Sequence, residues 1–62
     1  MKNLTTSLYA IANDHFEGYV TKGKEYPVFK ILEQKWGRRI VIINDKGVME
    51  DWGAEIFTFT TR

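Results

Sequence analysis

The alternation of apolar runs and turn residues between Tyr26 and Phe59 predicts two consecutive β-hairpins. Three runs rich in β-branched residues alternate with two Gly-containing turns, at 27–33, 34–37, 38–43, 44–47 and 48–52. Such runs, divided by short turns, are typical of neighbouring antiparallel strands. The middle of the chain is therefore expected to form an antiparallel sheet.

The residues that border these runs indicate where the strands begin and turn. Pro27 has no backbone N–H to donate to a sheet, so it is expected at the start of its strand or on a sheet edge. The order Asn44-Asp45-Lys46-Gly47 fits a type I turn in which Gly47 takes the left-handed conformation. The second hairpin is therefore expected to turn at Asn44–Gly47.

The two ends of the chain carry shorter patterns. By spacing alone, the apolar residues between Leu4 and Ala12 fit a helix and a strand equally well, and the all-β context favours a strand. Asn, Asp and Gly residues then indicate a loop and a turn. We expect a strand at 8–12, a loop at 13–18, a turn at 21–24, one helical turn at 53–55 and a last strand at 56–60.

Five short strands, with turns about every 8–12 residues, predict an all-β fold: one small antiparallel barrel over residues 1–62. One parity class of each strand should supply the interior, because successive strand residues face opposite sides. In the last strand Phe57 and Phe59 should face inward. The residues expected to be buried are Val28 or Phe29, Ile31 or Leu32, Ile40, Ile42, Phe57 and Phe59.

The composition limits how such a small domain can be stabilised. A chain of this size buries only about 60% of the surface that its unfolded form exposes. It has no Cys and one His, so disulfides and a structural zinc site are not expected, and no cofactor is predicted. Four Phe, three Tyr and two Trp can supply a core by aromatic packing, and self-association is the other route.

The location expected from the sequence is the cytoplasm. No run approaches the roughly 18 apolar residues of a membrane span, and the absence of Cys is compatible with a reducing compartment. The first twelve residues carry one positive charge and end in Ala-x-Ala, as a signal peptide would. Polar residues interrupt their apolar run, so they are interpreted as part of the fold.

The segments Thr21–Val28 and Ile42–Gly47, followed by Trp52 and Phe57, resemble the small Src-homology-three-like barrels encoded by bacteriophages and prophages. In those proteins a Lys-Gly-Lys-x-Tyr-x-Val segment leads into a long strand, and an Ile-Asn-Asp-x-Gly hairpin follows. The resemblance covers about residues 21–59. It implies a Src-homology-three-like barrel that is not an enzyme but an accessory binding protein.

The chain offers little catalytic chemistry. His15 beside Asp14 is the one acid–base candidate, and adjacent residues of an extended segment point in opposite directions. Glu50 and Asp51 are likewise adjacent, so they are not expected to face one substrate together. No Gly-flanked motif activates a Ser or Thr nucleophile. The sequence therefore predicts no enzyme activity, and no catalytic or metal-binding residue is assigned.

The residues around Trp36 are the strongest candidates for binding another protein. Trp36 lies at a predicted hairpin tip, and Arg38 and Arg39 follow it. Trp and Arg are enriched in interface hot spots. Together with Phe16 and Tyr19 of the first loop, these residues are the predicted surface for a partner, either a host protein that the domain occupies or inhibits or a second copy of the chain.

Two alternatives remain open from the sequence. The first is a nucleic-acid-binding barrel, in which basic side chains contact phosphates while Trp36 or Tyr26 stacks on bases. Its basic residues would be Lys22, Lys24, Lys35, Arg38 and Arg39. The net charge of +1 weighs against sequence-independent binding of this kind. The second alternative is an oligomer that sequesters a nucleotide-like ligand between its subunits.

Overall fold

The computed structural model describes residues 7–62, and the helix-like spacing that begins at Leu4 lies outside them in part. The described residues form six strands and one short 3-10 helix. In chain order these are β1 (Leu8–Ala12), β2 (Glu25–Pro27), β3 (Lys30–Gln34), β4 (Gly37–Ile43), β5 (Met49–Gly53), η1 (Ala54–Ile56) and β6 (Phe57–Thr61). The all-β prediction is confirmed.

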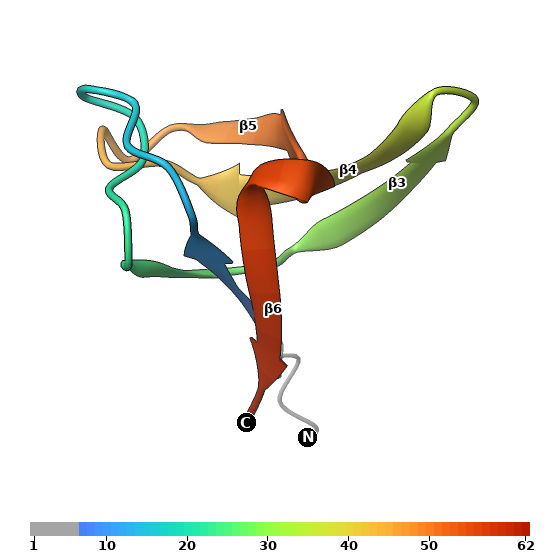
Figure 1. The fold of residues 1–62 in the computed structure, drawn as a ribbon, viewed down its shortest axis with the longest axis horizontal. Helices are drawn as coiled ribbons and strands as arrows, with labels where there is room; N and C mark the ends of the chain where they lie inside the picture. The colour runs from blue at the N-terminus through green and yellow to red at the C-terminus, as the bar shows by residue number, and fades with distance from the viewer. Residues whose placement is uncertain (1–6) are drawn as a thin grey trace, which may run out of the picture.

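The strands form two antiparallel three-stranded sheets, in the orders β2-β1-β6 and β3-β4-β5. Figure 1 shows β6 crossing in front of the second sheet, with η1 leading into it from β5. Among the strands of residues 7–62, no ladder joins the two sheets, so they do not close into a hydrogen-bonded barrel. The outer strands of both sheets are therefore edge strands.

The predicted strand 27–33 is divided between the two sheets. Val28 N donates to Leu8 O of β1 at 3.0 Å, and the next amide, Phe29 N, donates to Val41 O of β4 at 2.9 Å. The backbone thus changes its partner strand between Val28 and Phe29. One predicted strand becomes β2 and β3 for this reason, which gives six strands where five were expected.

Both predicted hairpin turns are confirmed. Gln34 pairs with Gly37, which leaves Lys35 and Trp36 as a two-residue turn between β3 and β4. At the second turn, Gly47 N donates to Asn44 O at 2.9 Å, and Gly47 has the expected left-handed backbone, with φ of 82°. The side-chain carbonyl of the buried Asn44 accepts backbone N–H groups from inside this turn, so the turn has a polar group of its own at its centre.

The core lies between the two sheets, where four of the predicted residues are found. Its buried apolar side chains are Ala10, Ala12, Val20, Tyr26, Val28, Ile40, Ile42 and Phe57. Val28, Ile40, Ile42 and Phe57 were expected there, and Val28 is the buried member of its predicted pair. Ala10 and Ala12 follow the strand alternation of β1, while Val20 and Tyr26 reach the core from the first loop and β2.

Two core predictions are wrong, the burial of Phe59 and the burial of either Ile31 or Leu32. Phe59 is 39% exposed, Ile31 is 45% exposed, and Leu32 is half-buried. Ile31 and Leu32 lie on β3, an edge strand whose hairpin extends past the other sheet (Figure 1). Phe59 has the parity of the buried Phe57, but it borders an open groove together with Ile31 and Ile40. The predicted parity of β6 thus holds, while the ring of Phe59 stays partly exposed.

Candidate functional site

The carboxylate of Asp45 joins the first loop (13–24) to the turn at 44–47. Its Oδ1 accepts hydrogen bonds from the Tyr26 hydroxyl at 2.8 Å and from Lys24 Nζ at 2.9 Å. Its Oδ2 accepts one from Thr21 Oγ1 at 2.7 Å, and Asp45 N donates to Tyr19 O at 2.8 Å. The loop is therefore held against the turn by backbone and side-chain bonds together.

These bonds shift the protonation equilibria of the cluster. Hydrogen bonds from Thr21, Lys24 and Tyr26, in that order, lower the pKa of the Asp45 carboxyl to about 2. The hydrogen bond to Asp45 raises the pKa of Lys24, while burial is the main reason that the pKa of Tyr26 is raised. At neutral pH, Asp45 is thus an anion whose acceptor positions are directed into the cluster.

The anchored loop presents two aromatic side chains to Trp52 of β5. The ring centroids of Phe16 and Trp52 are 5.1 Å apart at an interplanar angle of 52°, and those of Tyr19 and Trp52 are 6.4 Å apart at 53°. Both arrangements lie within the range of favourable aromatic pairs. Lys46 Nζ lies 4.4 Å from the centre of the Tyr19 ring, which adds a cation–π contact.

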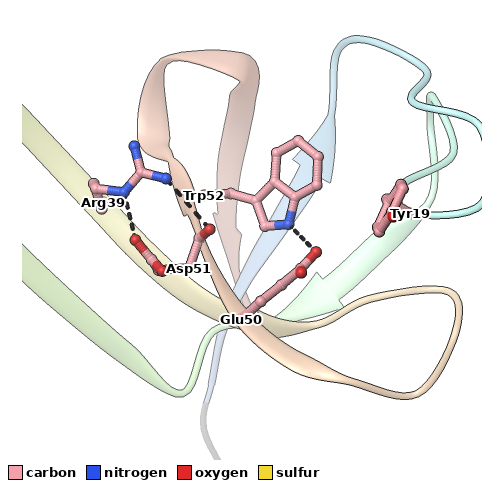
Figure 2. Close-up of a pocket in the computed structure, with 5 residues that line it drawn as sticks. All are labelled: Tyr19, Arg39, Glu50, Asp51 and Trp52. Carbon is pink, nitrogen blue, oxygen red and sulfur yellow. Dashed lines mark hydrogen bonds and ion pairs between the residues drawn. The ribbon is translucent and has the colours of Figure 1, made fainter.

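A hollow of about 290 Å³ opens beside these rings, and we call it the aromatic hollow. Figure 2 shows its five lining residues, Tyr19, Arg39, Glu50, Asp51 and Trp52. Trp52 Nε1 donates to Glu50 Oε2 at 2.6 Å. Arg39 Nε donates to Asp51 Oδ2 at 2.5 Å, and this bond lowers the pKa of the Asp51 carboxyl. The hollow therefore combines apolar rings with oriented charged groups.

The two carboxylates of the aromatic hollow show what it can do chemically. Glu50 and Asp51 border the same hollow, although they were not expected to face one substrate together. They lie on the edge strand β5, and Figure 2 shows their side chains at separate places along this strand. Each carboxylate already has a partner in the chain, an indole N–H or a guanidinium. This arrangement suits recognition by packing and charge more than transfer of a proton between two acids.

The structure separates the predicted partner-binding residues into two groups. Tyr19 and Arg39 line the aromatic hollow, and Phe16 packs on Trp52 beside it. Trp36 and Arg38 belong to the β3–β4 hairpin, where Trp36 is 86% exposed. Adjacent positions on β4 send Arg38 and Arg39 to opposite faces of the sheet. A smaller hollow of about 130 Å³, lined by Trp36 and both arginines among others, lies between the groups.

The residues of the nucleic-acid alternative are largely occupied by acidic partners. Lys24 pairs with Asp45 at 2.9 Å. Arg38 Nε lies 2.9 Å from Glu33 Oε2, and Arg39 pairs with Asp51. The remaining two are Lys22, exposed on the first loop, and Lys35, whose Nζ lies 5.8 Å from the centre of the Trp36 ring. Three of the five basic groups thus have a neutralising carboxylate.

His15, the acid–base candidate, lies on the exposed first loop. Its Nε2 is 3.1 Å from Glu17 Oε1, an exposed contact two residues along the chain. Among residues 7–62, no group of three or more His, Cys, Asp or Glu side chains could hold a metal ion. The same residues contain no helix long and apolar enough to cross a membrane.

Sequence reasoning did not identify Trp52 and Glu50 as part of the site. Trp52 packs against the core while its indole N–H donates to Glu50. The spacing Glu50-x-Trp52 is a signal that could have been used, because residues i and i+2 of a strand lie on one face. The packing of Phe16 and Tyr19 on Trp52 could not be predicted from such spacing, because Asp45 holds the first loop in place through bonds between distant parts of the chain.

The comparisons with known proteins do not extend this description. The chain matched no family model, no curated protein and no solved structure, so the resemblance to phage-encoded barrels stays a prediction.

Proposed function

We propose that the protein is a non-catalytic binding domain that recognises a partner protein through the aromatic hollow and the adjoining Phe16. The observation that carries the proposal is the gathering of Phe16, Tyr19 and Trp52 into one partly exposed cluster. Phe16 and Tyr19 are 40% and 41% exposed although both are large aromatic side chains. Such residues gain most when a partner removes them from water.

The anchoring of the first loop supports this assignment. Binding loses affinity when flexible side chains and loops must be ordered, so a surface that is already held in place keeps more of its interaction energy. The backbone of Tyr19 is fixed through its carbonyl by Asp45 N, and its ring is covered on one side by Lys46. The two rings and the carboxylate of Glu50 are thus presented as a preformed surface.

The resemblance to phage and prophage barrels extends the proposal to the partner and the fold. It implies that the partner is a protein of the bacterial host, which the domain occupies or inhibits in the host cytoplasm. It also implies that the two sheets correspond to a five-stranded Src-homology-three-like barrel, with β2 and β3 as one strand bent at Val28–Phe29. The continuous chain through Val28 and Phe29, whose amides bond to β1 and then to β4, supports this correspondence.

Nucleic-acid binding has less support. Phosphate contacts require free cationic groups along the binding surface. The ion pairs of Lys24, Arg38 and Arg39 would have to be broken or shared before these side chains could reach a phosphate. The aromatic hollow itself contains two carboxylates and one arginine, which disfavours an anionic ligand.

Affinity capture with a matched control tests the proposal. The tagged wild-type protein should recover a partner from a bacterial lysate treated with nuclease, with saturable binding. Phe16→Ala combined with Tyr19→Ala should weaken that binding by at least about 2 kcal/mol, because both rings belong to the contact. Met49→Ala, which truncates an exposed apolar side chain elsewhere, should bind as the wild type does.

Three results would contradict the proposal. The first is equal binding by the double variant, provided that its thermal unfolding stays cooperative. The second is the absence of any saturable protein partner. The third is recovery of nucleic acid in place of protein, with affinity that falls steeply as salt is raised, which would favour the nucleic-acid alternative.

A further inference from the structure

The lining of the aromatic hollow carries more negative than positive charge. Glu50 and Asp51 supply two carboxylates, and Arg39 supplies the guanidinium. Arg39 Nε lies 2.5 Å from Asp51 Oδ2, so this ion pair neutralises one of the two carboxylates. The charge that stays uncompensated in the hollow is therefore that of Glu50.

Glu50 is a half-buried carboxylate without a cationic partner in the described part of its own chain. Its Oε2 accepts the indole N–H of Trp52 at 2.6 Å, and no ion pair within residues 7–62 involves it. A carboxylate can accept about four hydrogen bonds, and charges withdrawn from water are normally paired. The hollow thus contains an anionic acceptor with capacity left for a cationic donor.

Two aromatic rings border the hollow beside this carboxylate. The centroids of Tyr19 and Trp52 are 6.4 Å apart at an interplanar angle of 53°, so the rings form two walls of a corner rather than a stack. Figure 2 shows Glu50 on the Tyr19 side of Trp52, apart from the ion pair. Cations are attracted to a ring within about 6 Å of its centroid, as Lys46 Nζ is to Tyr19 at 4.4 Å. Since Lys46 does not line the hollow, the corner is open to a second cation.

We propose that the aromatic hollow receives an arginine side chain of the partner protein, which packs its guanidinium against Tyr19 and Trp52 and donates hydrogen bonds to Glu50. The inference rests on the proposed function, since it names the group of the partner that the hollow binds. A guanidinium donates within its plane while its faces pack on aromatic rings, and it is more weakly hydrated than an ammonium. Arginine should therefore bind here more tightly than lysine, and lysine more tightly than an uncharged side chain.

Titration of the full chain with a blocked Gly-Arg-Gly tripeptide tests the assignment without the partner protein. The indole N–H signals of the two Trp residues in a nitrogen–proton correlation spectrum report the hollow and the hairpin tip separately. The signal of Trp52 should shift in a saturable manner, while that of Trp36 should not. The matching citrulline tripeptide has nearly the same shape without the charge. It should bind at least about tenfold more weakly, because it loses the cation–π contact and the charge-assisted hydrogen bond.

Two substitutions in the lining should change this affinity in opposite directions. Glu50→Gln removes the uncompensated charge but keeps an oxygen for the Trp52 indole, and it should weaken arginine binding by at least about tenfold. Arg39→Gln leaves Asp51 without its neutralising partner and should strengthen binding by roughly threefold or more, because a second negative charge then attracts the ligand. Glu33→Gln, which removes a carboxylate of the β3–β4 hairpin outside the hollow, is the matched control and should change nothing.

Affinity capture of the partner with the same Glu50→Gln variant separates this inference from the proposed function. Capture should weaken by a factor similar to that for the tripeptide. If the Phe16→Ala, Tyr19→Ala variant loses the partner while Glu50→Gln keeps it fully, the proposed function stands and the arginine assignment is overturned. An arginine tripeptide that leaves the Trp52 signal unmoved would also overturn it, as would a citrulline or lysine tripeptide that binds as tightly. So would an Arg39→Gln variant that binds more weakly than the wild type.

Discussion

The two ends of the molecule differ in what surrounds their hairpin turns. At one end, the turn at 44–47 lies beside the first loop and is joined to it through Asp45 (Figure 1). At the other end, the turn at Lys35–Trp36 projects past the first sheet, and Trp36 is almost fully exposed. Both turns follow from local sequence, but the turn at 44–47 is in addition hydrogen-bonded to the first loop.

This difference separates positions that stabilise the fold from positions available for contacts. Substitutions at the anchored end remove bonds on which the loop, the turn and the core depend together. Substitutions near the tip of the projecting hairpin, at Glu33, Trp36 and Arg38, change exposed side chains outside the core. The comparison therefore predicts a gradient of stability effects from the core and the anchored end to the hairpin.

The largest contrast is expected between two phenylalanines of β6 that have the same parity. Phe57→Ala should lower the free energy of unfolding by about 3–5 kcal/mol, because it leaves a cavity in the core. Phe59→Ala should cost only about 1 kcal/mol, since its ring is already partly exposed. Denaturant titration followed by circular dichroism measures both. Equal losses would mean that the sheets overlap as far as Phe59.

A smaller loss is expected when one hydroxyl is removed from the anchored end. The hydroxyl of Tyr26 donates to Asp45 Oδ1 and accepts Thr21 N at 2.8 Å. Tyr26→Phe should therefore cost about 1–2 kcal/mol, with the ring still packed in the core. Trp36→Phe at the hairpin tip is the matched aromatic control, and its effect should stay within about 0.5 kcal/mol. A neutral Tyr26→Phe variant would show that the loop is held without Asp45.

The acid stability of the protein should report the anchored end selectively. The pKa of Asp45 is about 2 in the folded chain and 3.8 as its ordinary value, so the anion binds protons less readily when folded. Its contribution to stability is complete above pH 4 or so and is lost as the pH falls toward about 2. Asp45→Asn should remove this part of the pH dependence in thermal melts between these values. If the stability of the Asp45→Asn variant fell with pH over this range as steeply as that of the wild type, the assignment of this pH dependence to Asp45 would be contradicted.

The smallest effect is expected at the ion pair of the projecting hairpin. Glu33→Gln removes the charge opposite Arg38 while keeping the shape of the side chain. Exposed ion pairs contribute only about 0–1 kcal/mol, so the melting temperature at low protein concentration should hardly change. A large loss would place this pair among the stabilising contacts of the fold and would remove the contrast between the two ends.

Local chemistry explains which features could be predicted from the sequence. The turns at 34–37 and 44–47 were predictable because each is specified by its own residues, and the last strand was placed within one residue. The break at Val28–Phe29 was not, because it depends on partners in β1 and β4 that are distant in the sequence. The extent to which the second sheet projects past the first could not be predicted either, because it depends on how the two sheets pack together.

The candidate site was predictable to a similar extent. Phe16 and Tyr19 could be named because they are aromatic residues of the predicted first loop. Their meeting with Trp52 could not, because it follows from the bond network of Asp45, a residue that the sequence presents only as part of a turn. Arg39 was named for its charge, and its ion pair with Asp51 is set by the register of β4 and β5.

The pairing of β1 with β6 also bears on how the chain folds. Leu8 pairs with Thr61, so the first sheet joins residues separated by nearly the whole described chain, whereas β3, β4 and β5 are connected by short turns. Closing a long loop costs more chain entropy than closing a short one, and nonlocal pairings slow folding. We therefore expect β3–β4–β5 to form early as a local meander. The first sheet, the Asp45 network and the aromatic hollow would then appear together in the final, rate-limiting step.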